Sequence, residues 1–374
     1  MRRRDLICSA VLLYAATAAG AQPIHVITSA HVDRSTLNIA AHENVTMTVD
    51  FAKSGIASVL VLDRDGFAVR ALASAEQVRG TTSFTWNGRD DRGRLVADEA
   101  YSFRIEWHGD GVVDVYDAGE ASAHVSAIAV GSYDRRTGTL TYTLPRPSRV
   151  HVQAGTAFLD PKTNKLVGPV MKTIVNREPR IDGAIAEHWN GYDESGAIFV
   201  PDLDNFVIAI AASPLPENSV LTFGNRERHF VDSLASRRGT SFFKLPGNHG
   251  HHTGLRTEDD ISPSLKIEPL NATWSPADHV WAVWAGAKRL RLRISVGGPT
   301  ATAFRRHPAT LELFVDGRRV GERDEPREIV EVPLDRSKVP HRVSINWNSE
   351  WGPVAANTIA VRTDEPPNAT RGIR

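Results

Sequence analysis

Three histidines lie close together in a glycine-rich stretch of the chain. His249, His251 and His252 occur within the run PGNHGHHTGLRTEDD, and Asp259 follows them. Neutral imidazoles and carboxylates are the usual protein ligands of zinc and similar divalent ions. A metal site at these four residues is therefore one prediction for this stretch. Another binding role is a second, and a plain structural loop is the third, which is favoured because the spacing matches no compact metal motif.

The histidines belong to a long connector, residues 226–263, that has no strand pattern. Connections longer than about 12 to 15 residues are usually functional or disordered. The connector is also basic and includes the adjacent pair Arg237 and Arg238. These basic side chains could bind an acidic glycan or an acidic protein surface, although exposed charged side chains are more often simply solvated. We keep Arg237 and Arg238 with the histidines as candidate binding residues.

Tryptophans of the C-terminal third offer a different chemistry, because an exposed indole can stack against a sugar ring. Trp351 lies in a turn next to Gly352 and Pro353 and is the candidate for such a contact. Trp281 and Trp347 fall on apolar strand faces, where a core position is expected. The sequence therefore offers carbohydrate binding, or an accessory role in polysaccharide processing, as an alternative function.

Catalytic signatures are missing from the sequence. It contains no G-x-S-x-G motif and no phosphate-binding glycine loop. Its one cysteine, Cys8, lies near the N-terminus. We therefore expect a protein that is not an enzyme and needs no cofactor, apart from the possible divalent metal.

The first 21 residues have the pattern of a secretory signal peptide. Arg2–Arg4 form a basic start, Leu6–Ala16 is an apolar run too short to span a bilayer, and Ala19–Ala21 supplies small residues before Gln22. Cleavage there would remove Cys8, so the mature chain would contain no disulfide. We expect an exported protein that is secreted, periplasmic or on the cell surface of a bacterium.

Charge and composition exclude several classes of protein. The full chain has 374 residues, with 44 basic and 44 acidic side chains, and loss of Arg2–Arg4 and Asp5 leaves a net charge of −2. A basic excess, which nucleic-acid binding requires, is therefore missing. Apolar residues make up 41% of the chain, which is too many for a disordered protein. No later segment has the roughly 20 apolar residues of a membrane span.

An eight-residue motif, W-N-G-x-D-[DE]-x-G, occurs twice, 103 positions apart. A glycine precedes each tryptophan by six positions. The paired residues are Gly80, Trp86, Asn87, Gly88, Asp90 and Gly93 in the first copy, and Gly183, Trp189, Asn190, Gly191, Asp193 and Gly196 in the second. We interpret both copies as tight turns of a repeated domain. A calcium loop is the alternative, but it would need more oxygen ligands.

The segments that flank the motifs alternate between apolar and polar residues, as half-buried strands do. Phe84 and Trp86 share one strand face, and Tyr101, Phe103 and Ile105 share another. Strands and turns in a segment of about 100 residues are typical of small β-sandwiches.

This arrangement of strands around a G-x5-W-N-G-x-D-x-x-G motif resembles the Ig-like domain of the flagellar hook-capping protein (FlgD-type). The resemblance covers roughly residues 30–127 and 128–225. It implies tandem Ig-like domains in a secreted bacterial protein. A flagellar role is not expected, because the signal peptide and the large C-terminal remainder depart from a hook cap.

The last third again shows strand alternation, with Leu290, Leu292 and Ile294 inward and arginines outward. We therefore predict an all-β chain of three consecutive Ig-like or fibronectin-like β-sandwich domains after a cleaved signal peptide. The predicted segments are 1–21 (signal peptide), 22–127 and 128–225 (the two repeats), 226–263 (connector), 264–363 (third sandwich) and 364–374 (tail).

A non-catalytic binding or assembly module at the bacterial envelope, or outside the cell, is the function that these features indicate. Its expected partner is another protein or an extracellular glycan, not a nucleic acid.

Overall fold

The computed structural model describes residues 25–118 except 65, 126–225 except 162, 264–298 except 285, and 309–363 except 325–327, 338 and 350–353. These residues form β-strands joined by turns, and a short 3-10 turn, η2 (Val200–Asp202), lies between β14 (Gly183–His188) and β15 (Phe206–Pro214). The predicted all-β fold is confirmed. Within the described ranges, no helix has the length and apolar character needed to cross a membrane.

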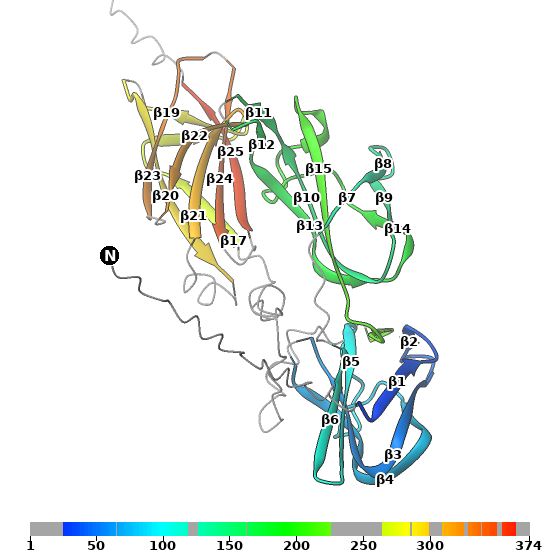
Figure 1. Cartoon of the computed structure of the whole chain (residues 1–374). Coiled ribbons are helices and arrows are strands. Elements are labelled where there is room, and N and C mark those ends of the chain that lie inside the picture. The colour runs from blue at the N-terminus through cyan, green and yellow to red at the C-terminus, as the bar shows by residue number, and fades with distance from the viewer. Residues whose placement is uncertain are drawn as a thin grey trace, which may run out of the picture.

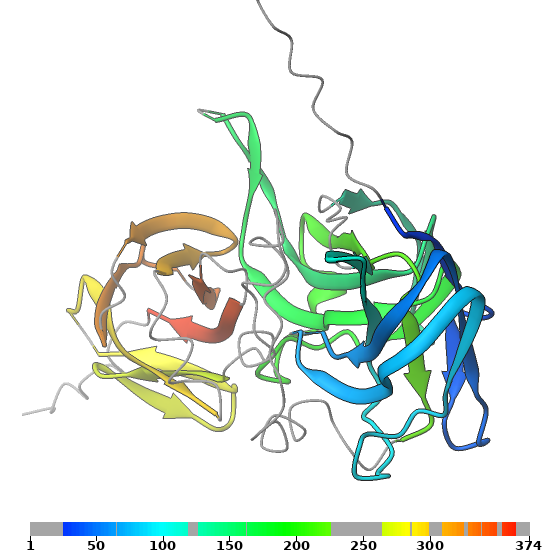
Figure 2. The ribbon, with the colours of Figure 1, turned by 60° about the horizontal axis from the view of Figure 1, so that its bottom comes forward.

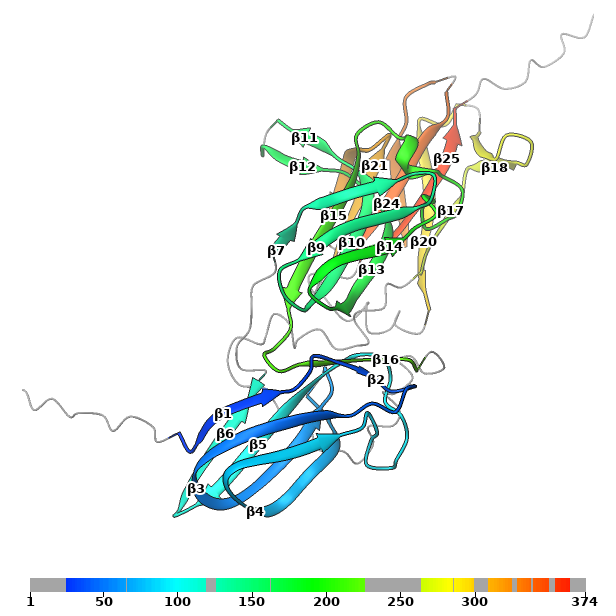
Figure 3. The same cartoon turned by 90° about the vertical axis from the view of Figure 1, so that its right-hand side faces the viewer.

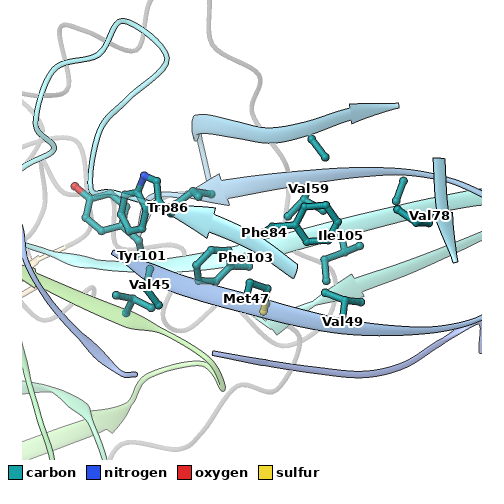
Figure 4. Packing of buried hydrophobic residues seen from close by; sticks show 14 of the residues in the cluster. Val45, Met47, Val49, Val59, Val78, Phe84, Trp86, Tyr101, Phe103 and Ile105 are labelled. Carbon is teal, nitrogen blue, oxygen red and sulfur yellow. The ribbon is translucent and has the colours of Figure 1, made fainter. Parts of the chain in front are cut away.

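The first sandwich lies at the bottom of Figure 1. Its strands are β1 (Ile27–Val32), β2 (Thr36–Asn38), β3 (Val45–Leu62), β4 (Ala68–Trp86), β5 (Ala100–Gly109), β6 (Val112–Asp117) and, from much later in the chain, β16 (Val220–Phe223). The buried residues follow the strand alternation, and Figure 4 shows Trp86 packed beside Tyr101 and Phe103. The ring centroids of Trp86 and Tyr101 are 5.2 Å apart.

Strand β3 is 18 residues long and serves both layers of this sandwich. Its first half pairs with β1 and with the end of β4, whereas its second half pairs with β5 and with the start of β4. The register shifts between Phe51 and Gly55, where the strand passes from one layer to the other. The ring of Trp107 is fully buried at this point, and a Cβ atom at Gly55 or Gly109 would overlap it.

The second sandwich consists of a four-stranded sheet in the order β13-β10-β15-β7 and a three-stranded sheet in the order β14-β9-β8. Its strands are β7 (Ser126–Ile128), β8 (Val130–Asp134), β9 (Thr139–Leu144), β10 (Ser148–Thr156), β13 (Val170–Arg180), β14 (Gly183–His188) and β15 (Phe206–Pro214). A separate hairpin of β11 (Phe158–Asp160) and β12 (Lys165–Val167) stands out from this sandwich (Figure 2). Alternate residues of β9 and β10, including Leu140, Tyr142, Val150 and Val152, form the core.

The third sandwich packs a three-stranded sheet, β17-β20-β23, against a six-stranded sheet, β18-β19-β25-β24-β21-β22. The strands are β17 (Ser264–Pro269), β18 (Ala272–Ser275), β19 (Val280–Val283), β20 (Arg289–Gly297), β21 (Ala309–Val315), β22 (Arg318–Arg323), β23 (Ile329–Pro333), β24 (His341–Ser349) and β25 (Val354–Arg362). As the alternation predicted, Leu290, Leu292 and Ile294 are buried in this core and the arginines between them are exposed.

Strand β16 returns from the second sandwich to the first. It pairs antiparallel with β5 and parallel with β2, and Figure 3 shows it lying beside β2 at the top of the first sandwich. The sequence repeat assigned residues 220–223 to the second domain, whereas the structure places their hydrogen bonds in the first. The second sandwich is therefore inserted between two strands, β6 and β16, of the first.

Candidate functional site

The first W-N-G motif begins at Trp86, the last residue of β4, and forms a tight turn. The indole N–H of Trp86 donates to the carbonyl of Arg89 (3.0 Å). The carboxylate of Asp90 accepts hydrogen bonds from the backbone N–H groups of Arg92 (3.0 Å) and Arg94 (2.9 Å), and from the Arg94 guanidinium (2.8 Å). Burial raises the pKa of Asp90, but the bonds from Arg94 and Arg92 outweigh it and leave the pKa below its usual value.

The second motif repeats this geometry after β14. The indole N–H of Trp189 donates to the carbonyl of Tyr192 (2.9 Å). Asp193, whose residue is only 3% exposed, accepts from the backbone N–H groups of Ala197 and Ile198 (both 3.1 Å) and from the Ser195 hydroxyl (2.8 Å). Both aspartates thus act as acceptors for the amides of their own turn, as short polar side chains in turns commonly do.

All six motif glycines have positive φ angles, which residues with a Cβ atom rarely adopt. They are Gly80, Gly88 and Gly93 in the first copy and Gly183, Gly191 and Gly196 in the second. Gly88 and Gly191 have a second constraint, because a Cβ atom would overlap Ile39 at the first and Phe199 at the second. The geometry therefore favours the structural interpretation of the two motifs over the calcium loop.

The binding residues proposed from the sequence lie outside the residues that the structure describes. They are His249, His251, His252, Asp259, Arg237, Arg238 and Trp351. The metal site and the connector's binding role therefore stay predictions. Within the described ranges, no group of three or more histidine, cysteine, aspartate or glutamate side chains is placed to hold a metal ion.

A buried carboxylate joins the first sandwich to the second. Glu99, which is 4% exposed, lies just before β5. Its Oε1 atom accepts a hydrogen bond from Nη1 of Arg149 on β10 (2.8 Å), and its Oε2 atom lies 3.5 Å from Nη1 of Arg64. The backbone N–H of Glu99 donates to the hydroxyl of Thr222 on β16 (3.1 Å). One residue thus contacts the inserted domain and the strand that follows it.

The segment before β16 is also anchored on the first sandwich. Asn218 donates to the carbonyl of Ala30 (2.8 Å) and to the hydroxyl of Tyr116 (2.7 Å), and it accepts from the backbone N–H of Val32 (3.2 Å). After β16, the side-chain amide of Asn225 donates to the carbonyl of Val96 (2.8 Å). Polar contacts on both sides of β16 therefore fix the return of the chain.

A different buried side chain joins the second sandwich to the third. Asn346 on β24 is 1% exposed. Its amide oxygen accepts from the backbone N–H of Val170 (2.8 Å), and its amide nitrogen donates to the carbonyl of the same residue (2.7 Å). Asn346 thus pairs with the start of β13 as a neighbouring strand would.

The alternation pattern explains why this junction is buried. Val343 and Ile345 face the core of the third sandwich, yet Ser344 and Asn346 on the opposite face of β24 are buried too. Successive side chains of a strand point to opposite faces. A strand buried on both faces must be covered by a further layer, and the second sandwich supplies it.

The β11–β12 hairpin extends the same junction. The Arg318 guanidinium lies over the ring of Phe158, 5.1 Å from its centroid. Gly317 has a φ of +81°, and a Cβ atom there would overlap the same ring. The turn between β21 and β22 therefore fits closely against the hairpin.

A partly buried histidine, His151, lies on β10. Burial, and next the positive charge of Arg177, lower the pKa of His151 to about 4. Its neighbours Asn176 and Gln153 offset this shift only in part. His151 is therefore neutral at pH 7.

Aromatic residues gather on the β18–β19 hairpin of the third sandwich. Trp274 pairs across the hairpin with Trp281, and their ring centroids are 5.4 Å apart. Trp281 and Trp347 pack against the core as expected, whereas Trp274 and Trp284 are exposed. Sequence reasoning did not single out Trp274. Its place opposite Trp281 across a short turn was the signal that could have found it.

The exposed arginines of β20 are matched by acidic residues on the neighbouring strands. Nη1 of Arg293 lies 3.2 Å from a carboxylate oxygen of Glu268 on β17. Arg289 and Arg291 each lie 4.0 Å from Glu331 on β23. This face is thus a solvated ladder of opposite charges, in which exposed pairs contribute little to stability.

Comparisons with solved structures find multidomain chains of low identity. Fibronectin(III)-like modules of CbhA from Clostridium thermocellum share 8% identity, covering 90% of this chain and 95% of theirs, with a TM-score of 0.20. The four N-terminal Ig domains of Dscam1 isoform 9.44 share 9%, covering 91% and 74%, also with a TM-score of 0.20. A bacterial ice-binding adhesin shares 11%, covering 91% and 99%, with a TM-score of 0.19. No protein with curated annotation matches the sequence.

A family comparison identifies the first sandwich. Residues 19–111 match the FlgD Ig-like domain. The match includes the first W-N-G motif with its turn and ends just before β6, so the inserted domain and β16 lie outside it. The first sandwich is therefore similar to a FlgD-type Ig-like domain over the matched residues.

Proposed function

We propose that the protein is an exported, non-catalytic binding or assembly module that acts at the bacterial envelope or outside the cell. Its Ig-like architecture suggests a binding or assembly role. The observation that carries the proposal is the construction of the two domain junctions, at Glu99 and at Asn346.

Contacts between domains of one chain usually permit relative motion unless the interface is extensive. Here the second sandwich is held by two chain connections to the first, and by the bond from Arg149 to Glu99. The third is held by the paired hydrogen bonds of Asn346 and by the β11–β12 hairpin. A scaffold of this kind keeps its exposed loops and strand edges at fixed separations, which lowers the entropy lost when a large partner binds.

Export is supported by the signal-peptide pattern of residues 1–21. A domain stabilised by apolar cores and buried polar contacts needs no disulfide, in keeping with a mature chain that would lack cysteine. Metal binding at His249, His251 and His252 remains the alternative for the connector. The glycan alternative gains support from the exposed tryptophans of the third sandwich.

Two measurements test this proposal. A C-terminally tagged chain should be recovered outside the cytoplasm with Gln22 as its first residue, whereas an intact N-terminus in the cytoplasmic fraction would overturn export. Cross-linking on intact cells should then trap the chain in a complex of fixed stoichiometry. The matched control carries Asn346→Ala, which should weaken the rigid scaffold without changing export. Recovery of monomeric, uncross-linked protein alone would contradict an assembly role.

A further inference from the structure

An exposed aromatic corner lies at the tip of the β18–β19 hairpin. Trp274 is 42% exposed. The ring of Trp281 lies 5.4 Å from it at an interplanar angle of 57°, and the ring of His279 lies 6.1 Å from it at 67°. Because the three rings are tilted and not stacked, they form an angled apolar surface. We call Trp274, Trp281 and His279 the aromatic corner.

The turn that carries this corner is held in place. One carboxylate oxygen of Asp278, Oδ2, accepts from the Ser275 hydroxyl (3.1 Å) and from the Arg362 guanidinium on β25 (2.9 Å). Trp281 belongs to β19, which pairs with β25, and its ring packs against the core of the third sandwich. The corner is therefore preorganised, and a ligand would lose little free energy in ordering it.

The turn beside the exposed indole carries polar groups that have no hydrogen-bond partner among the described residues. Within the residues that the structure describes, neither the indole N–H of Trp274 nor the imidazole of His279 takes part in a hydrogen bond. The second carboxylate oxygen of Asp278, Oδ1, likewise accepts none from the described residues. The corner thus offers an apolar ring face together with both donors and acceptors.

We infer that the aromatic corner binds a neutral polysaccharide, with one pyranose ring stacked on Trp274. A pyranose combines an apolar face of C–H groups with a rim of hydroxyls that donate and accept, which matches this set of groups. The ion pair of Asp278 with Arg362 leaves the site without net charge, so no charged ligand is favoured. A protein partner would require a far larger contact area than one indole and its neighbours provide.

This inference names the partner class of the proposed binding module and rests on that proposal. It also adds a second sugar-contact candidate, on the β18–β19 hairpin, to the one that the sequence suggests at Trp351. Trp351 lies outside the residues that the structure describes, so the sequence-based prediction there stays a prediction beside the exposed indole of Trp274.

The same hairpin supplies a matched control. Trp284 is 57% exposed, and its indole N–H donates to the hydroxyl of Thr273 (3.2 Å). Thr273 and Trp274 are successive residues of one strand, so their side chains point to opposite faces. Trp284 is therefore an exposed tryptophan on the other face of the hairpin, with its N–H already occupied.

The experiment uses the mature full chain on an array of neutral polysaccharides, namely glucans, xylans, mannans and galactans. Calorimetry with a hexasaccharide of the best-bound polymer then compares variants of equal thermal stability. Trp274→Ala should weaken binding about tenfold or more, Trp274→Phe should weaken it less, and Trp284→Ala should change it less than about twofold.

Two outcomes would overturn the inference. One is the binding of no neutral polysaccharide by the wild-type chain, and the other is an equal loss of affinity in Trp274→Ala and Trp284→Ala. If no glycan binds while intact cells still yield a cross-linked complex of fixed stoichiometry, this inference fails and the proposed assembly function stands.

Discussion

Replacing Asn346 by alanine should uncouple the third sandwich from the second. The side chain makes two hydrogen bonds to the backbone of Val170, at 2.8 and 2.7 Å. Alanine removes both and leaves the N–H and the carbonyl of Val170 without partners at a part-buried position. No other residue of the described junction pairs with a backbone N–H and carbonyl in this way.

The size of the effect follows from these two groups. An unsatisfied buried donor or acceptor costs about 1 to 3 kcal/mol. Because Val170 is only partly buried, water can satisfy part of its hydrogen bonding, and we expect a total loss of about 2 to 3 kcal/mol. For a unit of the size of two such domains, each kcal/mol lowers the melting temperature by about 2 to 4 °C, which gives a decrease of about 4 to 12 °C.

Differential scanning calorimetry of the mature chain measures this coupling. The wild-type second and third sandwiches should unfold in one transition, and Asn346→Ala should split that transition or lower its midpoint. The matched control is Asn348→Ala, which removes an amide on the same strand whose bond, to Glu312 at 2.6 Å, stays within the third sandwich. A change in Asn346→Ala no larger than that of the control would refute the assignment of Asn346 to the junction.

Three further changes test other parts of the structure. Gly55→Ala should destabilise the first sandwich by about 2 kcal/mol or more, because its Cβ atom overlaps the buried ring of Trp107. Urea unfolding followed by tryptophan fluorescence measures this loss of stability. An unchanged unfolding midpoint would contradict the packing of Trp107 against Gly55. Burial lowers the pKa of His151 to about 4. Between pH 6.5 and 4 the unfolded chain therefore binds one more proton than the folded chain. The free energy of unfolding should fall by up to about 3 kcal/mol as the pH decreases through this range. Melting temperatures measured across these pH values should show a shallower decrease in His151→Gln, and equal slopes would argue against a neutral, partly buried imidazole. Arg149→Met should lower stability by about 2 kcal/mol, because the buried carboxylate of Glu99 then keeps only the more distant Arg64 as its charged partner. A double-mutant cycle with Glu99→Gln measures the coupling between Arg149 and Glu99. Strict additivity of the two substitutions would exclude this coupling.

Strand patterns local to the sequence were predicted correctly. In β20, the alternation of leucine and isoleucine with arginine identified both the buried and the exposed face. The positions of Trp86 and Phe103 in the core of the first sandwich were also predicted, because a period of two residues determines which side chains share a face. Such predictions succeed because they depend only on near neighbours in the chain.

The repeat identified two related turns, but it could not locate β16. Residues 220–223 have a strand pattern that suits either sandwich, and their pairing with β5 and β2 depends on residues more than 100 positions earlier. The exposed position of Trp274 has a similar origin. Its strand lies at the edge of the six-stranded sheet, and the sequence does not reveal sheet order.

The sequence by itself determined the all-β class, the FlgD-type motif and the residues that form its turns, because alternation and positive-φ glycines are local properties of the chain. The tertiary structure alone decided that the second domain is inserted into the first. It also decided that Glu99 and Asn346 hold the junctions and that Trp274 is exposed beside Trp281. These features depend on which distant segments meet, and that choice follows from the packing of whole sheets.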